Sequence, residues 1–224
     1  MEKKVKNIFL GLGADVCGIA GIDRFDSAPH GFHPRDLYAA CNSVIVFAKH
    51  MPKGLSAVSP RIIYDKATDM NLFEMDRIAY LGSLAVEALG CAAVPLPSDS
   101  PYEYWDETQK EGRGILSMRH AAMLAGIGSM GKNTLILNER YGNRINIGAV
   151  LTDLRLESDP LAEALCLETC RKCLESCPTS ALSGTTVNQQ LCRAFTYTTN
   201  ARGFSVCNCN TCRMICPVGG GSDL

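Results

Sequence analysis

Two cysteine-rich stretches, CLETCRKCLESCP at residues 166–178 and CNTCRMICP at residues 209–217, stand out in this 224-residue chain. Each contains the spacing C-x2-C-x3-C-P. The residues that make it up are Cys170, Cys173, Cys177 and Pro178 in the first stretch, and Cys209, Cys212, Cys216 and Pro217 in the second. Because one spacing occurs twice within a short segment, we interpret the two stretches as one functional unit.

This spacing is typical of the ligands that hold [4Fe-4S] clusters in bacterial ferredoxins. A cluster needs thiolates from several directions, and a tight C-x2-C turn supplies neighbouring ligands. In two-cluster ferredoxins, the cysteine before the proline binds the other cluster. The sequence therefore predicts crossed ligation, with a first cluster held by Cys166, Cys170, Cys173 and Cys216.

The second predicted cluster takes Cys209 and Cys212 together with Cys177 and one further thiol. Two cysteines remain for that place. Cys207 forms a local C-x-C with Cys209, and Cys192 lies in the segment LCRAFTYTT. Nine cysteines between residues 166 and 216 serve eight places, so one of them is spare.

Other roles for the cysteines fit the pattern less well. Structural zinc sites also use sets of four thiolates, but usually as separate C-x2-C knuckles without the C-x3-C-P ending. Disulfides are disfavoured because a cytosolic chain is kept reduced. The three remaining cysteines, Cys17, Cys41 and Cys91, lie in or beside apolar segments, and we interpret them as buried, inert thiols.

The composition is that of a globular protein. There are 22 basic and 23 acidic residues, for a net charge of -1, and 46% of the residues are apolar. This balance gives no support for a role on DNA or on a membrane surface. Neither a secretory signal nor a long apolar run is present, so we expect a cytoplasmic protein with no membrane partner.

The first 150 residues alternate between helical and strand patterns. Helices are expected at 2–12, 61–89 and 115–125, and strands at 15–20, 43–49, 92–96, 134–137 and 145–151. The stretch PSDSPYEYWDE at 97–107 is expected to be a loop, and the charged segment 153–160 a domain boundary. We predict an α+β protein with an α/β domain at 1–157 and a ferredoxin-like double [4Fe-4S] domain at 158–224.

A glycine-rich stretch, GIGSMGKNT at residues 126–134, matches G-x-G-x-x-G and nearly matches a P-loop. Dinucleotide and phosphate loops need a strand before them and a helix after them. Here a helix precedes and a strand follows, and Asn133 stands where a P-loop has a hydroxyl for magnesium. We therefore expect no nucleotide site, but a sharp turn that approaches a packed element or a planar cofactor closely.

The stretch AGIGSMGKNTLILNERYGNRINIGAVLTDLRLESD, followed by CRKCLESCPTSAL and CNTCRMICP, resembles the epoxyqueuosine reductase family and, more distantly, the corrinoid reductive dehalogenases. The resemblance implies a nitroreductase-like α/β domain, two [4Fe-4S] clusters and a cobalamin held between that domain and the clusters. It also favours Cys192 over Cys207 as the ligand of the second cluster. The residues we expect at the cofactor are Gly131, Lys132, Asn133 and Thr134.

Two features depart from that family. Its catalytic aspartate has no counterpart in KEGRGILSMRH at 110–120, where His120 is an alternative proton donor and Arg119 or Lys132 an alternative anion ligand. A histidine in such a setting is more often a packed or capping residue, so the catalytic residue stays unassigned. In that family the chain continues into a helical tRNA-binding extension, whereas this sequence ends at Leu224. We therefore do not expect tRNA as a partner.

Together these patterns predict a reductase that passes single electrons through two clusters to a corrinoid and then to a small-molecule substrate. Its electron donor would be a ferredoxin or flavodoxin. Two alternatives remain: an electron carrier or redox subunit without an organic cofactor, and a protein with a flavin in place of the corrinoid. The flavin is considered because flavin reductases also use the implied fold, and a fold alone does not decide a function.

Overall fold

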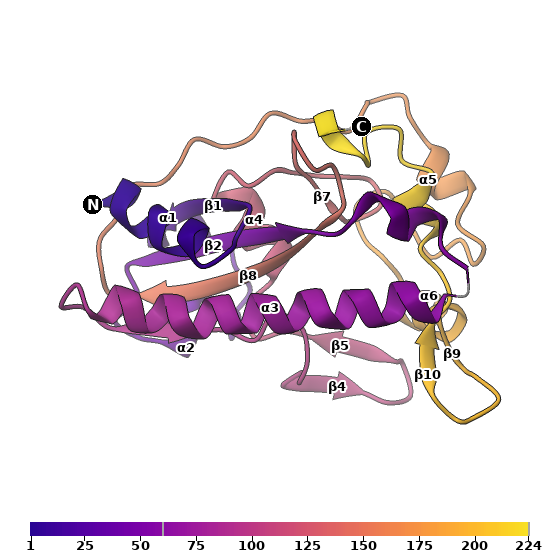
Figure 1. The fold of residues 1–224 in the computed structure, drawn as a ribbon, viewed down its shortest axis with the longest axis horizontal. Coiled ribbons are helices and arrows are strands. Elements are labelled where there is room, and N and C mark those ends of the chain that lie inside the picture. The colour runs from indigo at the N-terminus through magenta and orange to yellow at the C-terminus, as the bar shows by residue number, and fades with distance from the viewer. Residues whose placement is uncertain (60, 224) are drawn as a thin grey trace.

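The structure is a computed structural model, and it describes residues 1–59 and 61–223. Its centre is a four-stranded antiparallel sheet in the order β1-β2-β8-β3 (Figure 1). The strands are β1 (Val16–Gly21), β2 (Ser43–His50), β8 (Ile145–Thr152) and β3 (Ala93–Pro95). Strands β2 and β8 pair along their whole length, from Ser43 opposite Thr152 to His50 opposite Ile145. Both are apolar runs, as expected for strands that are covered on both faces.

Helices cover the two faces of this sheet. On one face lie α1 (Glu2–Gly11) and the long α3 (Ile62–Glu87), where Phe9 stacks on Phe47 with 5.0 Å between ring centroids. On the other face lies α4 (Met118–Leu124). A Cβ atom at Gly18 of β1 would lie 2.1 Å from the carbonyl oxygen of Ala125, so glycine allows the end of α4 to pack against the strand. This contact fixes where the glycine-rich turn begins.

The remaining elements are short. The strands form three two-stranded pairs, namely β4 (Tyr104–Asp106) with β5 (Glu111–Arg113), β6 (Ser129–Met130) with β7 (Ile136–Leu137), and β9 (Tyr197–Thr199) with β10 (Ser205–Cys207). The helices are α2 (Pro34–Leu37), α5 (Lys172–Glu175), α6 (Gln189–Thr196), α7 (Thr211–Met214) and the 3-10 turns Ile22–Phe25, Lys53–Ala57 and Gly221–Asp223. None of the helices in residues 1–59 and 61–223 combines the length and the apolar character needed to cross a membrane.

The mixed α and β class predicted from the sequence is confirmed, and the main helices and strands lie close to their expected positions. The expected loop at 97–107 differs, because β4 lies within it and pairs with β5. The expected strand at 134–137 is reduced to Ile136–Leu137. Thr134 has a φ of 60°, which belongs to a turn and not to a strand.

The segment expected as a domain boundary packs along the sheet. It is drawn in orange in Figure 1 and runs from the end of β8 toward α5. Asp159 receives a hydrogen bond from the Ile19 N–H at 2.9 Å and donates its own N–H to the Ile19 carbonyl at 2.9 Å. Ser158 accepts from the Gly21 N–H at 2.8 Å. These bonds satisfy polar groups at the open edge of β1, which would otherwise be available to another strand.

Candidate metal centre

The two cysteine motifs form two short helices that lie in contact, on the right-hand side of Figure 1. Helix α5 lies between Cys170 and Cys177, and α7 lies between Cys209 and Cys216. Each helix stops before a proline, which has no backbone N–H and cannot continue it. The two motifs thus present their thiols from adjoining turns.

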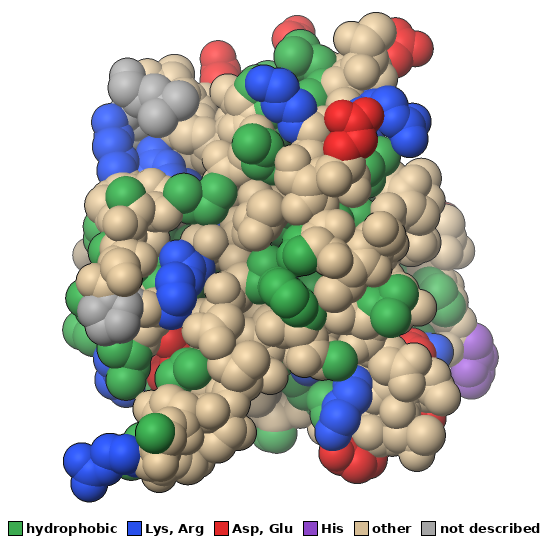
Figure 2. All heavy atoms as spheres, turned by 90° about the vertical axis from the view of Figure 1, so that its right-hand side faces the viewer, with side chains coloured by type: hydrophobic (Ala, Val, Ile, Leu, Met, Phe, Trp, Pro, Cys, Tyr) green, Lys and Arg blue, Asp and Glu red, His purple; other side chains and the backbone are tan. Residues whose placement is uncertain are grey.

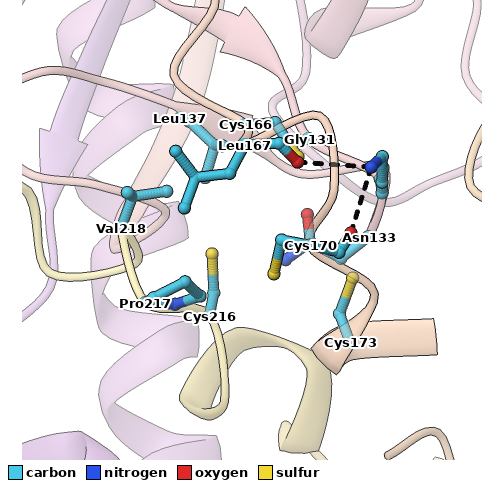
Figure 3. Close-up of a pocket in the computed structure, with 11 residues that line it drawn as sticks. Gly131, Asn133, Leu137, Cys166, Leu167, Cys170, Cys173, Cys216, Pro217 and Val218 are labelled. Carbon is cyan, nitrogen blue, oxygen red and sulfur yellow. Dashed lines mark hydrogen bonds between the residues drawn. The ribbon is translucent and has the colours of Figure 1, made fainter. Parts of the chain in front are cut away.

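Four thiols border one hollow, and we call them the first thiol group. They are Cys166, Cys170, Cys173 and Cys216. In Figure 3 the sulfur atoms of Cys170, Cys173 and Cys216 point into a common space, with Leu137 and Val218 at its side. The hollow contains about 320 Å³ of empty space, including the part open to solvent. Burial raises the pKa of the Cys216 thiol, and the other thiols of the group raise it further.

Four more thiols form the second thiol group, which we define as Cys212 and the three thiols that act on it electrostatically. They are Cys177, Cys192, Cys209 and Cys212. Burial raises the pKa of the Cys212 thiol to about 11, the other thiols of this group raise it as well, and Arg213 lowers it. Helix α6 supplies Cys192, and Asn188 caps this helix by accepting the Leu191 N–H at 3.0 Å.

Cys207 has different surroundings. Its N–H donates to Asp65 of α3 at 3.0 Å, and its side chain packs against the cluster of Met51, Leu55 and Tyr64. Burial raises the pKa of its thiol. Cys207 therefore lies on the α3 side of Cys209.

The surface over this part of the molecule is shown in Figure 2. Hydrophobic side chains gather in the middle of the face, and lysine and arginine side chains are scattered instead of forming one patch. The large apolar side chains exposed in the C-terminal segment include Leu191, Phe195, Tyr197, Phe204, Met214 and Ile215.

The glycine-rich turn lies against the ligand segments of both thiol groups. Lys132 donates to the carbonyls of Leu167 at 3.2 Å and Cys170 at 3.0 Å, drawn as dashed lines in Figure 3, and also to that of Glu168. Asn133 donates to the Cys212 carbonyl at 3.0 Å. The expected residues Lys132 and Asn133 thus contact the cysteine motifs directly.

The same turn also holds Arg119. Thr134 accepts hydrogen bonds from Arg119 on its carbonyl at 2.9 Å and on its hydroxyl at 3.0 Å. His120, the alternative proton donor, is exposed, and its Nδ1 lies 2.7 Å from the Ser117 hydroxyl at the start of α4. The structure therefore ties each of these side chains to a local partner.

A second hollow lies between the end of β2 and the C-terminal segment, with about 740 Å³ of empty space including the part open to solvent. Its lining comes from three distant parts of the chain, and it includes Cys216. Four lining side chains carry a buried polar atom that has no hydrogen-bond partner among the described residues. These atoms are Asn143 Oδ1, Arg144 Nε, Asn210 Nδ2 and Arg213 NH1.

No motif in the sequence marks these four residues as a group. Asn210 and Arg213 lie next to Cys209 and Cys212 of the second motif, which is the one signal in the sequence that points to them. Asn143 and Arg144 have no such signal, because only the fold brings the start of β8 to the C-terminal segment. There Asn143 donates from its main chain to the Gly219 carbonyl at 2.9 Å.

Comparison with known proteins shows what the chain is similar to. An epoxyqueuosine reductase of Listeria monocytogenes is 34% identical over 123 residues, which are 50% of this chain and 32% of that protein. An epoxyqueuosine reductase of Bacillus anthracis is 28% identical over 213 residues, which are 86% of this chain and 52% of that protein. A tetrachloroethene reductive dehalogenase of Dehalobacter restrictus is 29% identical over 176 residues, covering 77% and 28%. The resemblance predicted from the sequence is confirmed.

The chain spans about half the length, or less, of these curated relatives. No protein-family model matches it. Among solved structures, the epoxyqueuosine reductase from Bacillus subtilis superposes with a TM-score of 0.68 at 22% identity, over 99% of this chain and 66% of that one. A reductive dehalogenase described in terms of B12-dependent dehalogenation superposes with a TM-score of 0.67 at 20% identity, over 94% of this chain and 30% of that one. At these identities the likeness shows the fold.

One expectation is wrong. The expectation that tRNA is no partner rested on the position at which the sequence ends. An epoxyqueuosine reductase solved with an epoxyqueuosine-modified tRNA-Tyr stem loop superposes on 99% of this chain, with a TM-score of 0.67 at 21% identity over 66% of that protein. The fold of this chain thus corresponds to 66% of a protein that was solved with a tRNA stem loop, and this finding overturns the exclusion.

Proposed function

We propose that the chain is an iron–sulfur reductase, in which two [4Fe-4S] clusters pass single electrons to a bound corrinoid and then to a substrate. One observation carries the proposal: the thiols fall into two groups of four, and each group combines cysteines from both motifs. Crossed ligation in two-cluster ferredoxins has this same pattern. The relatives, which are reductases, support the same class of reaction.

The arrangement of the thiols favours clusters over zinc. A zinc ion holds its sulfur ligands at about 2.3 Å from one centre. Thiols that surround a hollow suit a cluster, which binds them through irons at its corners. We therefore assign the first and second thiol groups to one cluster each, with Cys192 and not Cys207 in the second.

The same proposal divides the chain into a nitroreductase-like domain at 1–157 and a ferredoxin-like double-cluster domain at 158–224. The contact between α5 and α7 supports the second domain, since both helices carry ligand motifs. The thiols must stay reduced for cluster binding, so we place the protein in the cytoplasm.

The second hollow is the proposed corrinoid site. It borders Cys216, and Asn143, Arg144, Asn210 and Arg213 in its lining carry amide and guanidinium groups that can form hydrogen bonds with the amide groups around a corrin ring. Asn143, Arg144, Asn210 and Arg213 would hold the cofactor, whereas the expected cofactor residues Gly131, Lys132 and Asn133 line the hollow of the first thiol group. When bound, the corrinoid supplies one-electron chemistry at cobalt. A structural neighbour described in terms of B12-dependent dehalogenation supports this choice.

The cofactor is tested by equilibrium dialysis of the anaerobically prepared protein against hydroxocobalamin and, separately, against flavin mononucleotide. We expect stoichiometric cobalt and no flavin. An Arg144→Leu variant should bind less cobalt, whereas Arg155→Leu, which removes an exposed charge outside the hollow, should bind as the original does. If the protein binds flavin and no cobalamin, a flavin takes the place of the corrinoid in the proposed function. If it binds neither, the protein is an electron carrier without an organic cofactor.

Substrates should be chosen from the chemistry of the relatives. Their names give an epoxide in a tRNA nucleoside and a chlorinated alkene, both of which are consumed by reduction. Assays with the cobalamin-loaded protein should therefore include an epoxyqueuosine-modified stem loop and tetrachloroethene. Turnover of either one identifies the substrate class.

A further inference from the structure

The side chain of Lys132 is bound entirely within the first ligand segment. Its ammonium donates to three main-chain carbonyls, those of Leu167, Glu168 and Cys170. An ammonium has three N–H groups, so these acceptors satisfy all of them. Lys132 lies 35 to 38 positions before these residues in the sequence. Lys132 therefore fixes the loop between Cys166 and Cys170 to the glycine-rich turn.

The same residue also borders the hollow of the first thiol group, together with all four of its cysteines. Its neighbour Asn133 is 3% exposed and binds the Cys212 carbonyl of the second group. Two adjacent residues thus reach both groups, but only Lys132 carries a charge. Among residues 1–59 and 61–223, Lys132 supplies the only positive charge in the lining of the first hollow.

We propose that Lys132 is a positioning residue of the first cluster, and that its charge raises the reduction potential of that cluster. The proposal rests on the function proposed above. Reduction adds one negative charge to a cluster, so a nearby cation stabilises the reduced form. Water screens exposed charges strongly, but Lys132 is half-buried and its bond to the Cys170 carbonyl is partly buried, so its charge is screened less than that of a fully exposed lysine.

The glycine-rich stretch thereby gains a role that its motif does not predict. In a P-loop the lysine would bind a phosphate. Here the three carbonyls already use its hydrogen bonds, and the residue lines the hollow that the first thiol group borders. Gly131 helps to form this turn, because a Cβ there would lie 2.7 Å from the Asn133 side-chain oxygen.

The test compares three variants in the reconstituted full chain. Lys132→Met keeps the length of the side chain and removes the charge, and Lys132→Arg keeps the charge. Lys172→Met is the matched control, since Lys172 adjoins Cys173 but is exposed to solvent. Iron content and the potentials of the two clusters are measured by redox titration followed by electron paramagnetic resonance.

In Lys132→Met we expect the ratio of reduced to oxidised first cluster, at a fixed potential, to fall about tenfold, which is about 59 mV for one electron. The potential of the second cluster should not change in Lys132→Met. In Lys132→Arg and Lys172→Met, the potentials of both clusters should stay near those of the original protein. Loss of four irons in Lys132→Met alone would also support the positioning role. Unchanged potentials with full iron, or an equal shift in Lys172→Met, would overturn the proposal. Iron analysis of the original protein tests the proposed function separately.

Discussion

At the scale of single residues, Cys192 and Cys207 show how surroundings separate two similar thiols. The sequence left both open, because each lies near the second motif. In the structure the Cys192 thiol is among those that raise the pKa of Cys212, whereas Cys207 packs beside Tyr64 and binds Asp65. The choice between Cys192 and Cys207 depends on the position of helix α3. The spacing of the cysteines in the sequence carries no information about that position.

This difference gives a direct prediction. Cys192→Ser should lose one cluster and retain about four irons per chain, and Cys207→Ser should retain about eight. Iron and sulfide analysis after anaerobic reconstitution measures both. The reverse result, with iron lost only in Cys207→Ser, would contradict the assignment.

Cys17 is predicted to be unreactive in the folded protein. Burial raises the pKa of its thiol to about 12, and Asp159 adds to the rise while Lys6 opposes it. Since the thiolate is the nucleophile, alkylation at pH 9 should be about a thousandfold slower than in the urea-unfolded chain, where the thiol pKa is about 8.5. The native rate should rise about tenfold per pH unit up to pH 12.

Mass spectrometry after timed iodoacetamide treatment measures the modification at Cys17. A native rate within tenfold of the unfolded rate would contradict the prediction. The same raised pKa stabilises the fold below about pH 8.5, and this contribution is lost as the pH rises toward 12.

Residue roles were predictable where chemistry is encoded in spacing. Six of the eight expected cluster ligands follow from C-x2-C-x3-C-P, Cys166 lies in the same run as the first motif, and Cys192 is favoured by the family resemblance. The structure places four of the eight thiols around one hollow and three others near Cys212. Lys132 was expected at the cofactor, but its partners were not, because they are main-chain carbonyls that any sequence provides. Asn143 and Arg144 gave no signal at all.

At the scale of elements, the hairpin β4–β5 is attached to α6. Gln189 of α6 accepts the Gly112 N–H and donates to the Gly112 carbonyl, each at 3.0 Å. Arg193 of the same helix lies over the rings of Tyr102 and Trp105, at 5.2 and 5.1 Å from their centroids. The helix that supplies Cys192 is thus supported by this hairpin.

Removing that support should loosen the hairpin. In Gln189→Ala the loss of two hydrogen bonds, at about 1 kcal/mol each, should speed amide exchange at Gly112 about thirtyfold. Gln190→Ala is the control, since Gln190 makes one exposed bond to the Thr108 carbonyl. Hydrogen exchange followed by mass spectrometry compares the two, and equal rates in both variants would contradict the role of Gln189.

The glycine-rich turn is a second element with a sharp requirement. Gly126 has a φ of 72°, and a Cβ there would lie 2.1 Å from the Pro160 carbonyl oxygen. Gly126→Ala should therefore cost about 3 kcal/mol and lower the Tm by about 6 to 12 °C. Gly54→Ala, with nothing within 4 Å of the new Cβ, should change little. Anaerobic calorimetry at one scan rate measures both, and equal Tm values would contradict the close approach.

Elements with a buried face were predictable, and exposed ones were not. Strands β2 and β8 are continuous apolar runs, so their type and limits followed from the sequence. All three residues of strand β4 are exposed, so no pattern of alternating burial marks it. Its pairing depends on contacts with α6 that lie far away in the sequence.

At the scale of the whole molecule, the two hollows arise where distant segments meet. The hollow beside Cys216 takes its lining from the end of β2, the start of β8 and the C-terminal segment. The segment 153–160 holds the edge of β1 through Ser158 and Asp159. The sequence predicted the parts of this arrangement, but the space between them depends on tertiary packing alone.

The central claim is that the chain holds two [4Fe-4S] clusters, and its most direct test is an iron, sulfide and zinc count on the anaerobically reconstituted protein. The account predicts about eight irons and eight sulfides per chain, with an electron paramagnetic resonance signal of two interacting clusters after reduction. About two zinc ions without sulfide would contradict it.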